Sequence, residues 1–99
     1  MPGKDLKWSD RSLDENRRLT IYLYNEWGEE IALRIQEQID KAVIRIQRSP
    51  EHFPIFSKRK NIRRCVLSPQ TSIFFREHKQ GILIISIFDN RQSPKKRKL

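Results

Sequence analysis

The chain has 99 residues, of which 36% are hydrophobic and 33% are charged, and its formal net charge is +9 at pH 7. This length suits one domain with a single core of two helices on a small sheet. No apolar run approaches the ~20 residues that a membrane span requires, and the first residues lack the apolar region of an export signal. We therefore expect a cytoplasmic protein, and its single cysteine, Cys65, suits such a reducing compartment.

An N-terminal strand is predicted over Lys4–Trp8, where apolar and charged residues alternate. Ser9 then has the side chain of a helix N-cap, because its hydroxyl can accept a hydrogen bond from a free amide of the first turn. The helix that follows has an apolar stripe and ends at Gly28, a residue type that tolerates the backbone conformation found at helix ends. The stripe consists of Leu13, Asn16, Leu19, Thr20, Leu23 and Trp27.

A second helix is predicted to begin at Glu29, because acidic residues favour the positive N-terminal end of a helix. It stops before Pro50, since a proline disfavours helical geometry in the residue ahead of it. Two helices joined by one glycine predict an antiparallel helical hairpin, with Trp27 and Ile39 among its buried residues. The core stripe of the second helix consists of Ala32, Ile35, Ile39, Ala42, Val43 and Ile46.

The hydrophobic period changes after a predicted loop over residues 49–61. Three strands are then predicted at Ile62–Leu67, Ser72–Glu77 and Ile82–Phe88. The expected fold class is α+β: an N-terminal strand, an antiparallel helical hairpin and a three-stranded antiparallel meander, in the order β-α-α-β-β-β. We expect a single domain over residues 1–94 and a basic disordered tail over residues 95–99.

The positive charge is concentrated in the second half of the chain. Residues 1–50 hold nine Lys or Arg and nine Asp or Glu, whereas residues 51–99 hold twelve against three. This asymmetry indicates a polyanionic partner or an acidic protein partner. The C-terminal "PKKRKL" resembles a nuclear import signal, but such a run is equally typical of a nucleic-acid arm or of the charged end of a folded domain.

Seven basic residues in this half form the candidate target-binding set. Guanidinium groups can bind phosphates bidentately or stabilise the charge that develops during RNA cleavage. In the alternative interpretation, single arginines pair with acids such as Glu77 or Asp89. The two histidines are far apart and lack paired cysteines, so we expect neither a metal site nor a cofactor. The set consists of Lys58, Arg59, Lys60, Arg63, Arg64, Arg76 and Arg91.

The chain resembles the RelE/ParE superfamily of bacterial toxins, which belong to type II toxin–antitoxin modules. The resemblance is carried by "WSDRSLDE…YNEWGEE", "RSPEHFP", "KRKNIRRCVL", "SIFFRE" and "GILIISIFDNRQSP". It extends from about Leu6 to Pro94 and rests on the order and spacing of these segments. It implies a helical hairpin against a small antiparallel sheet in a bacterial cytoplasmic protein.

The superfamily contains two mechanisms. RelE-like members cut messenger RNA in the ribosome, often with a His or Tyr near the C-terminus, and ParE-like members inhibit DNA gyrase. Asp89 occupies the position where many members carry His, and an ionised aspartate cannot act as an acid near neutral pH. The resemblance therefore favours a gyrase inhibitor that is not an enzyme. The alternative is a ribosome-dependent mRNA endoribonuclease, whose catalytic residues would be Lys60, Arg64, Arg76, Asp89 and Arg91.

The resemblance also implies a cognate antitoxin that wraps the toxin with its C-terminal segment, in a toxin–antitoxin hetero-oligomer. Apolar residues outside the two core stripes are expected to contact it, because an apolar patch outside the core suggests a partner. The alternative is that tilted helices bury them. These residues are Ile21, Tyr22, Leu33 and Ile44. The remaining alternative for the whole chain is a basic nucleic-acid-binding module without toxin activity.

Overall fold

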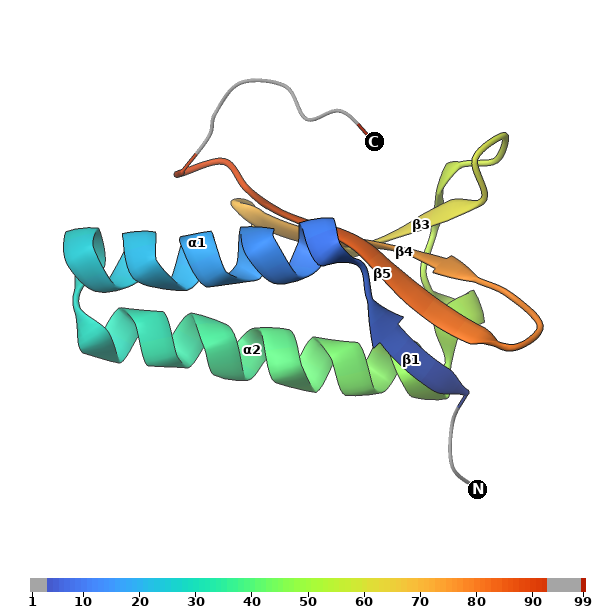
Figure 1. Cartoon of the computed structure of the whole chain (residues 1–99), viewed down its shortest axis with the longest axis horizontal. Coiled ribbons are helices and arrows are strands. Elements are labelled where there is room, and N and C mark those ends of the chain that lie inside the picture. The colour runs from blue at the N-terminus through green and yellow to red at the C-terminus, as the bar shows by residue number, and fades with distance from the viewer. Residues whose placement is uncertain (1–3, 93–98) are drawn as a thin grey trace.

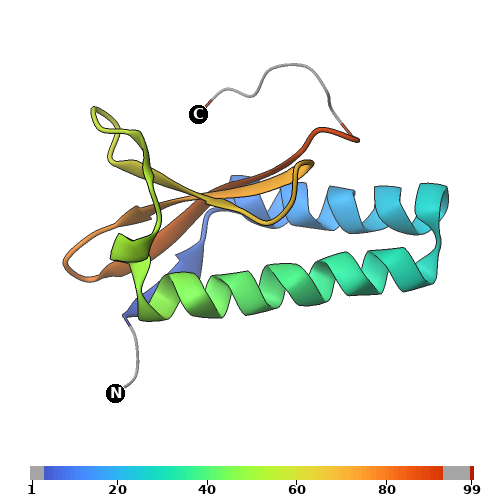
Figure 2. The ribbon, with the colours of Figure 1, turned by 180° about the vertical axis from the view of Figure 1, so that it is seen from behind.

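The computed structural model describes residues 4–92 and residue 99, and a helical hairpin covers one face of its mixed five-stranded sheet (Figures 1 and 2). The spatial strand order is β1-β5-β4-β3-β2, in which β1 is parallel to β5 and the other pairs are antiparallel. The elements are β1 (Asp5–Trp8), α1 (Asp10–Trp27), α2 (Glu29–Arg48), the 3-10 turn η1 (Pro50–His52), β2 (Ile55–Ser57), β3 (Ile62–Val66), β4 (Thr71–Glu77) and β5 (Gly81–Asp89).

The predicted α+β class and the helical hairpin are confirmed, but the meander after the hairpin has four strands rather than three. The additional strand, β2, lies in the segment predicted as a loop. It has three residues, and its pairing with β3 shifts register between Ile55 and Ser57. A strand this short and irregular leaves no period-two pattern in the sequence. Residues 95–98 of the predicted 95–99 tail lie outside the described residues.

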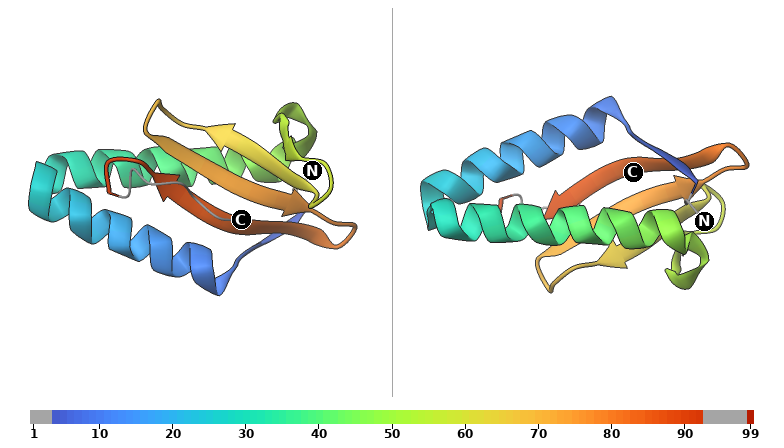
Figure 3. Two further views of the ribbon diagram at one scale, coloured as in Figure 1. Left: turned by 90° about the horizontal axis from the view of Figure 1, so that it is seen from above. Right: turned by 90° about the horizontal axis from the view of Figure 1, so that it is seen from below.

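The core lies between the hairpin and the sheet, as the two views of Figure 3 show. Figure 3 shows that α2 crosses the strands whereas α1 lies beside β5, and α2 lies antiparallel to α1 after a turn at Gly28, whose φ is +94°. Ile39 is buried as predicted. The buried core residues are Leu19, Leu23, Ala32, Ile39, Ala42, Ile46, Cys65, Ile73, Phe75, Ile82, Ile84 and Ile87.

Two residues of the predicted stripe on α1 are exposed instead of buried. Trp27 is 53% exposed because the end of the hairpin extends beyond the sheet and no strand covers it (Figure 3). Leu13 is equally exposed because Ser12 occupies the buried position of that turn. Successive residues of a helix are about 100° apart, so burial of Ser12 turns Leu13 away from the sheet.

The N-terminal part of α1 lies against the edge of β5 that β1 leaves uncovered. β1 pairs with β5 only as far as Trp8 and Ile84. Beyond this point the Ser9 amide and the Ser12 hydroxyl donate to the carbonyl oxygen of Ile84, at 2.9 and 3.1 Å. The Ser9 hydroxyl donates to the carbonyl of Ile85, 2.9 Å away, and accepts from the Ser12 amide as the N-cap of α1.

Glu15 continues this contact one turn further along the helix. Its Oε1 atom accepts from the Ser86 hydroxyl at 2.7 Å and from the Ile87 amide at 3.0 Å. The pairing of β5 with β4 is irregular here, because Phe74 is opposite Ser86 whereas Phe75 is opposite Ile84. Side chains of α1 therefore bind the polar backbone groups of a bulged strand edge, which would otherwise be buried without partners.

Gly81 is required where β1 begins to pair with β5. A Cβ atom at this position would overlap the carbonyl oxygen of Asp5, which is backbone and cannot rotate away. The first residue of β5 must therefore lack a side chain if β1 is to lie beside it.

We predict that Glu15→Ala lowers the free energy of unfolding by about 1–3 kcal/mol, because it leaves the Ser86 hydroxyl and the Ile87 amide without an acceptor. Glu15→Gln keeps an acceptor oxygen, so we expect it to lower the free energy of unfolding by a smaller amount. Urea unfolding followed by circular dichroism measures both, with Glu26→Ala as the matched control on the exposed surface of the same helix. Equal midpoints for Glu15→Ala and Glu26→Ala would show that the contact with β5 does not stabilise the fold.

Candidate functional site

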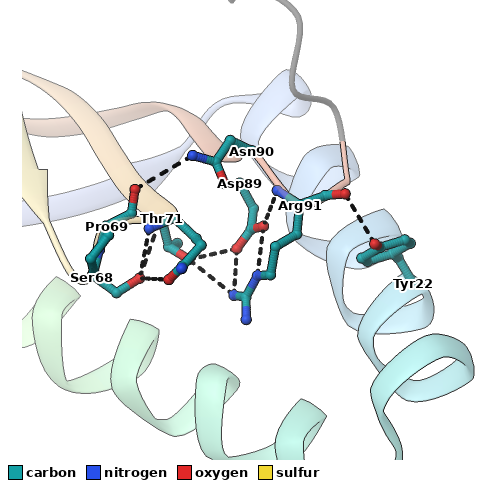
Figure 4. A network of polar contacts seen from close by, with 8 residues as sticks. Tyr22, Ser68, Pro69, Thr71, Asp89, Asn90 and Arg91 are labelled. Carbon is teal, nitrogen blue, oxygen red and sulfur yellow. Dashed lines mark hydrogen bonds and ion pairs between the residues drawn. The ribbon is translucent and has the colours of Figure 1, made fainter.

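The C-terminal end of β5 holds a network around a buried carboxylate (Figure 4). The Asp89 side chain has no exposed surface, and Arg91 binds it bidentately: Nε donates to Oδ1 at 3.0 Å and Nη2 to Oδ2 at 2.7 Å. The Arg91 amide also donates to Oδ1, and the Thr71 hydroxyl donates to Oδ2. Thr71 is directly opposite Asp89 in the β4–β5 ladder, so strand register brings these groups together.

The network keeps Asp89 ionised. Burial alone would raise the pKa of the Asp89 carboxyl group, but hydrogen bonds from Arg91 and Thr71 and the charge of Arg91 outweigh it, so that the pKa lies below its usual value. The hydrogen bond to Asp89 in turn raises the pKa of Arg91. Asp89 is therefore an acceptor and a counter-ion, and it has no proton to donate near neutral pH.

Tyr22 reaches the same network from α1, although it is distant from Asp89 in the sequence. Its hydroxyl donates to the carbonyl oxygen of Arg91 at 3.0 Å, and its ring packs against the core. Thr71 and Tyr22 were not predicted to lie near Arg91. Strand register would have identified Thr71, but no local sequence pattern shows which residue of a helix lies over a strand end.

The turn between β2 and β3 carries a separate basic cluster, defined as Lys58, Arg59 and Lys60. All three residues are exposed. Arg76, on β4, joins this cluster because its Nε atom donates to the carbonyl oxygen of Lys60 at 2.9 Å. The Lys60 ammonium group contacts the carbonyl oxygen of Leu99. Arg76 and Thr71 lie near opposite ends of β4, roughly 17 Å apart along the strand, so the basic cluster is remote from Arg91.

Arg63 and Arg64 point to opposite faces of β3, as predicted. Arg63 Nη1 donates to the carbonyl oxygen of Phe53 at 2.6 Å. Arg64 Nε donates to the Ser72 hydroxyl at 3.1 Å, and its guanidinium lies 5.8 Å from the centre of the buried Phe74 ring. Both side chains are half-buried and already bound within the fold. The seven candidate residues thus occupy several separate places rather than one site.

The thiol of Cys65 is a further group with reactive chemistry. Cys65 is buried in β3, and burial raises the pKa of its thiol, although the charge of Arg45 opposes this. A neutral buried thiol is a poor nucleophile. The described part of the chain contains no group of three or more His, Cys, Asp or Glu able to hold a metal ion. Nor does it contain a helix that is long and apolar enough to span a membrane.

The outer surface of the helical hairpin, which faces away from the sheet, exposes apolar side chains. Leu33, Ile21 and Ile44 are 62%, 51% and 47% exposed, whereas Tyr22 is partly buried by its contact with the core. Antiparallel pairing brings Thr20 of α1 to Gln36 of α2, a hydrogen-bond distance of 3.1 Å. The outer apolar surface of the hairpin consists of Leu13, Ile21, Tyr24, Trp27, Leu33 and Ile44.

We predict that Arg91→Ala destabilises the protein by about 2–3 kcal/mol, because it leaves the Asp89 carboxylate buried without a counter-ion. The cost stays below that of a fully buried pair, since the Arg91 side chain is 20% exposed. Because Asp89 has a lowered pKa when folded, the pair stabilises the protein above the unfolded-state pKa of ~3.9 and ceases to do so as the pH falls through the folded-state value.

Thermal melting from pH 7 down to well below the unfolded-state pKa of ~3.9 tests this prediction, since the stabilisation by the pair is lost in that acidic range. The difference between wild type and Arg91→Ala is expected to shrink on acidification. Arg59→Ala, which removes an exposed arginine from the basic cluster, should change the melting temperature little at any pH. A difference that does not change with pH would show that Arg91 stabilises the fold by packing rather than by charge.

Comparisons with known proteins agree with this fold. The sequence matches no protein-family model, and no curated protein is significantly similar to it. A chain of the chromosomal ParDE TA system from P. aeruginosa aligns with a TM-score of 0.75 and 22% sequence identity, covering 87% of this chain and 95% of that chain. A chain of the E. coli DinJ–YafQ complex aligns with a TM-score of 0.53 and 10% identity, covering 91% and 97%. The chain therefore shares its fold with both of these chains, and its likeness to the ParDE chain is the greater of the two.

Proposed function

We propose that the chain is the toxin of a type II toxin–antitoxin module, active in the bacterial cytoplasm and neutralised by a cognate antitoxin. The observation that carries this proposal is the structural likeness to a chain of a ParDE TA system over most of both chains. The likeness to a chain of the DinJ–YafQ complex supports the same class. The exposed apolar surface of the hairpin is consistent with a protein partner.

The proposed target is DNA gyrase, which the toxin would inhibit by binding rather than by catalysis. The chemistry of Asp89 supports this choice, because a carboxylate held by Arg91 and Thr71 cannot act as a general acid. The candidate catalytic residues Lys60 and Arg76 also lie near the end of β4 remote from Asp89 and Arg91. A ribonuclease would need its acid, base and charge-stabilising groups close to one scissile phosphate.

The alternative target is ribosome-bound messenger RNA. It is favoured by the basic cluster, where three exposed cations lie together beside Arg76. Cations in such an arrangement bind a phosphate backbone and can stabilise the charge of a transition state. The basic cluster is therefore the proposed target-binding surface in either case.

We expect the purified protein to inhibit supercoiling by gyrase and to leave ribosome-bound messenger RNA intact. Lys58→Gln/Arg59→Gln is expected to weaken inhibition by about ten-fold, because charge complementarity contributes to association. Arg17→Gln/Arg18→Gln is the matched control, since it removes two exposed charges that pair with Asp14 on the opposite layer.

The possible outcomes separate the two targets. Codon-dependent cleavage of messenger RNA by the wild type, with supercoiling unaffected, would replace gyrase by the ribosome. Normal growth and normal supercoiling after induced expression, with messenger RNA intact, would contradict the toxin assignment itself.

The proposed antitoxin-binding surface is the outer apolar surface of the hairpin. Leu33 and Ile44 both lie on α2, eleven residues apart, which is three helical turns and places them on the same side of the helix. The outward side of α2 between them carries Glu37 and Asp40, whereas Arg17 lies on the adjacent face of α1. An amphipathic segment of the antitoxin would cover these apolar side chains and pair with the flanking charges.

We predict that Leu33→Ser/Ile44→Ser weakens antitoxin binding by about ten-fold or more, since buried apolar anchors dominate interface energies. The double variant should keep the wild-type melting temperature, because both side chains are exposed in the isolated chain. Calorimetric titration with the protein encoded beside the toxin measures the effect. Ile55→Ser/Val66→Ser removes two equally exposed apolar residues from the sheet and serves as the control. Loss of binding in the control alone would place the antitoxin on the sheet instead.

A further inference from the structure

A second cationic site lies where α2 ends and the 3-10 turn begins. A pocket of ≈ 340 Å³ opens there, and its walls come from the last turn of α2 and from the residues just after it. This volume is within the range of small-molecule sites in proteins, which begins at about 300 Å³. The lining residues are Arg45, Arg48, Ser49, His52 and Phe53. None of the sequence patterns above predicts this site.

The two arginines of the pocket have no acidic partner among the described residues. Both are exposed, whereas Arg17, Arg18 and Arg91 are engaged in ion pairs. The Glu51 carboxylate is 3.8 Å from His52 of the pocket, and both side chains are largely in solvent. Such an exposed contact is weak and does not neutralise the pocket.

The helix dipole is too weak to balance the positive charge of the two arginines at this place. Arg45 and Arg48 are in the last turn of α2, where cations complement the negative end of the helix dipole. That end carries roughly half an elementary charge, against two full charges from the guanidinium groups. The carbonyl oxygen of Arg45 is moreover bound by the Ser49 amide. The pocket therefore retains a positive potential that an anion would stabilise.

Phe53 gives the pocket an ordered apolar wall. Its ring packs edge-to-face on the buried Phe75, with centroids 5.7 Å apart. The Arg45 guanidinium lies 6.0 Å from the centre of the ring, and Arg63 donates to the Phe53 carbonyl oxygen at 2.6 Å. The ring is consequently fixed between the core and a cation. It offers a surface on which a nucleobase or a sugar can pack.

We propose that this pocket binds the terminal phosphate of a nucleotide or of a nucleic-acid strand. A terminal phosphate carries a charge of about −1.5 to −2 at pH 7, which matches two arginines, whereas an internal phosphodiester or a carboxylate carries one negative charge. Two guanidinium forks also supply enough donors for its three oxygens. Phe53 then contacts the attached sugar or base, which a carboxylate side chain lacks. The site is independent of the proposed toxin function.

The test compares two fluorescently labelled single strands of about ten nucleotides, identical except for a 5′-phosphate or a 5′-hydroxyl group. The isolated wild-type chain is expected to bind the phosphorylated strand about ten-fold more tightly in anisotropy titrations at constant salt. Arg45→Gln/Arg48→Gln is expected to bind both strands equally. Arg34→Gln/Lys79→Gln removes the same charge from exposed positions outside the pocket and should keep the preference.

Several results would overturn the proposal. They are equal affinity of the wild type for both strands, a preference that persists in Arg45→Gln/Arg48→Gln, and displacement of the strand by an oligo-aspartate peptide of the same total charge. Competition by AMP but not by adenosine would support a free nucleotide as the source of the phosphate. A preference that AMP does not abolish would support a strand end. Arg45→Lys/Arg48→Lys keeps the charge and should lose most of the preference, because an ammonium group lacks the bidentate fork.

Discussion

The contact between the start of α1 and the edge of β5 determines how the two layers of this protein are joined. The contact is made by three residues at a spacing of three along the chain: Ser9, Ser12 and Glu15. This spacing places them on one side of the helix, where they bind successive polar groups of the strand. This arrangement fixes both the position and the direction of α1 along the edge of the sheet. Tyr22 is consequently carried over the end of β5, where its hydroxyl binds the carbonyl oxygen of Arg91.

The same geometry explains why the charged groups divide into separate sites. The pairing of β4 with β5 places Thr71 and Asp89 at one end of the sheet and Arg76 at the other. At the end with Asp89 the charges already have partners within the fold, because Arg91 and Thr71 bind both oxygens of the carboxylate; this is the closed end. The other end is open and exposes the basic cluster in the turn before β3. The closed end therefore stabilises the strand terminus, whereas the open end is available to a polyanionic or acidic partner.

Most of the fold could be predicted from the sequence because the strong signals are local. The Ser9 cap, Gly28 and Pro50 mark the helix ends, and the long strands have clear apolar patterns. What could not be predicted depends on tertiary position: Trp27 is exposed because the sheet ends before the helix does. For the same reason the site was only partly anticipated. The pairing of Asp89 with Arg91 is local, but Tyr22 and the Arg45–Arg48 pocket depend on how the helices lie against the strands.

The separation of apolar and basic surfaces constrains how one partner can cover both. The apolar surface lies on the outward side of the hairpin, whereas the basic cluster lies on a turn of the sheet. The molecule measures 39 × 31 × 23 Å, so a partner helix of about 20 residues, which spans ~30 Å, covers the hairpin along most of its length. Such a helix alone leaves the basic cluster exposed. A partner that covers both surfaces must therefore continue past the hairpin with an acidic segment.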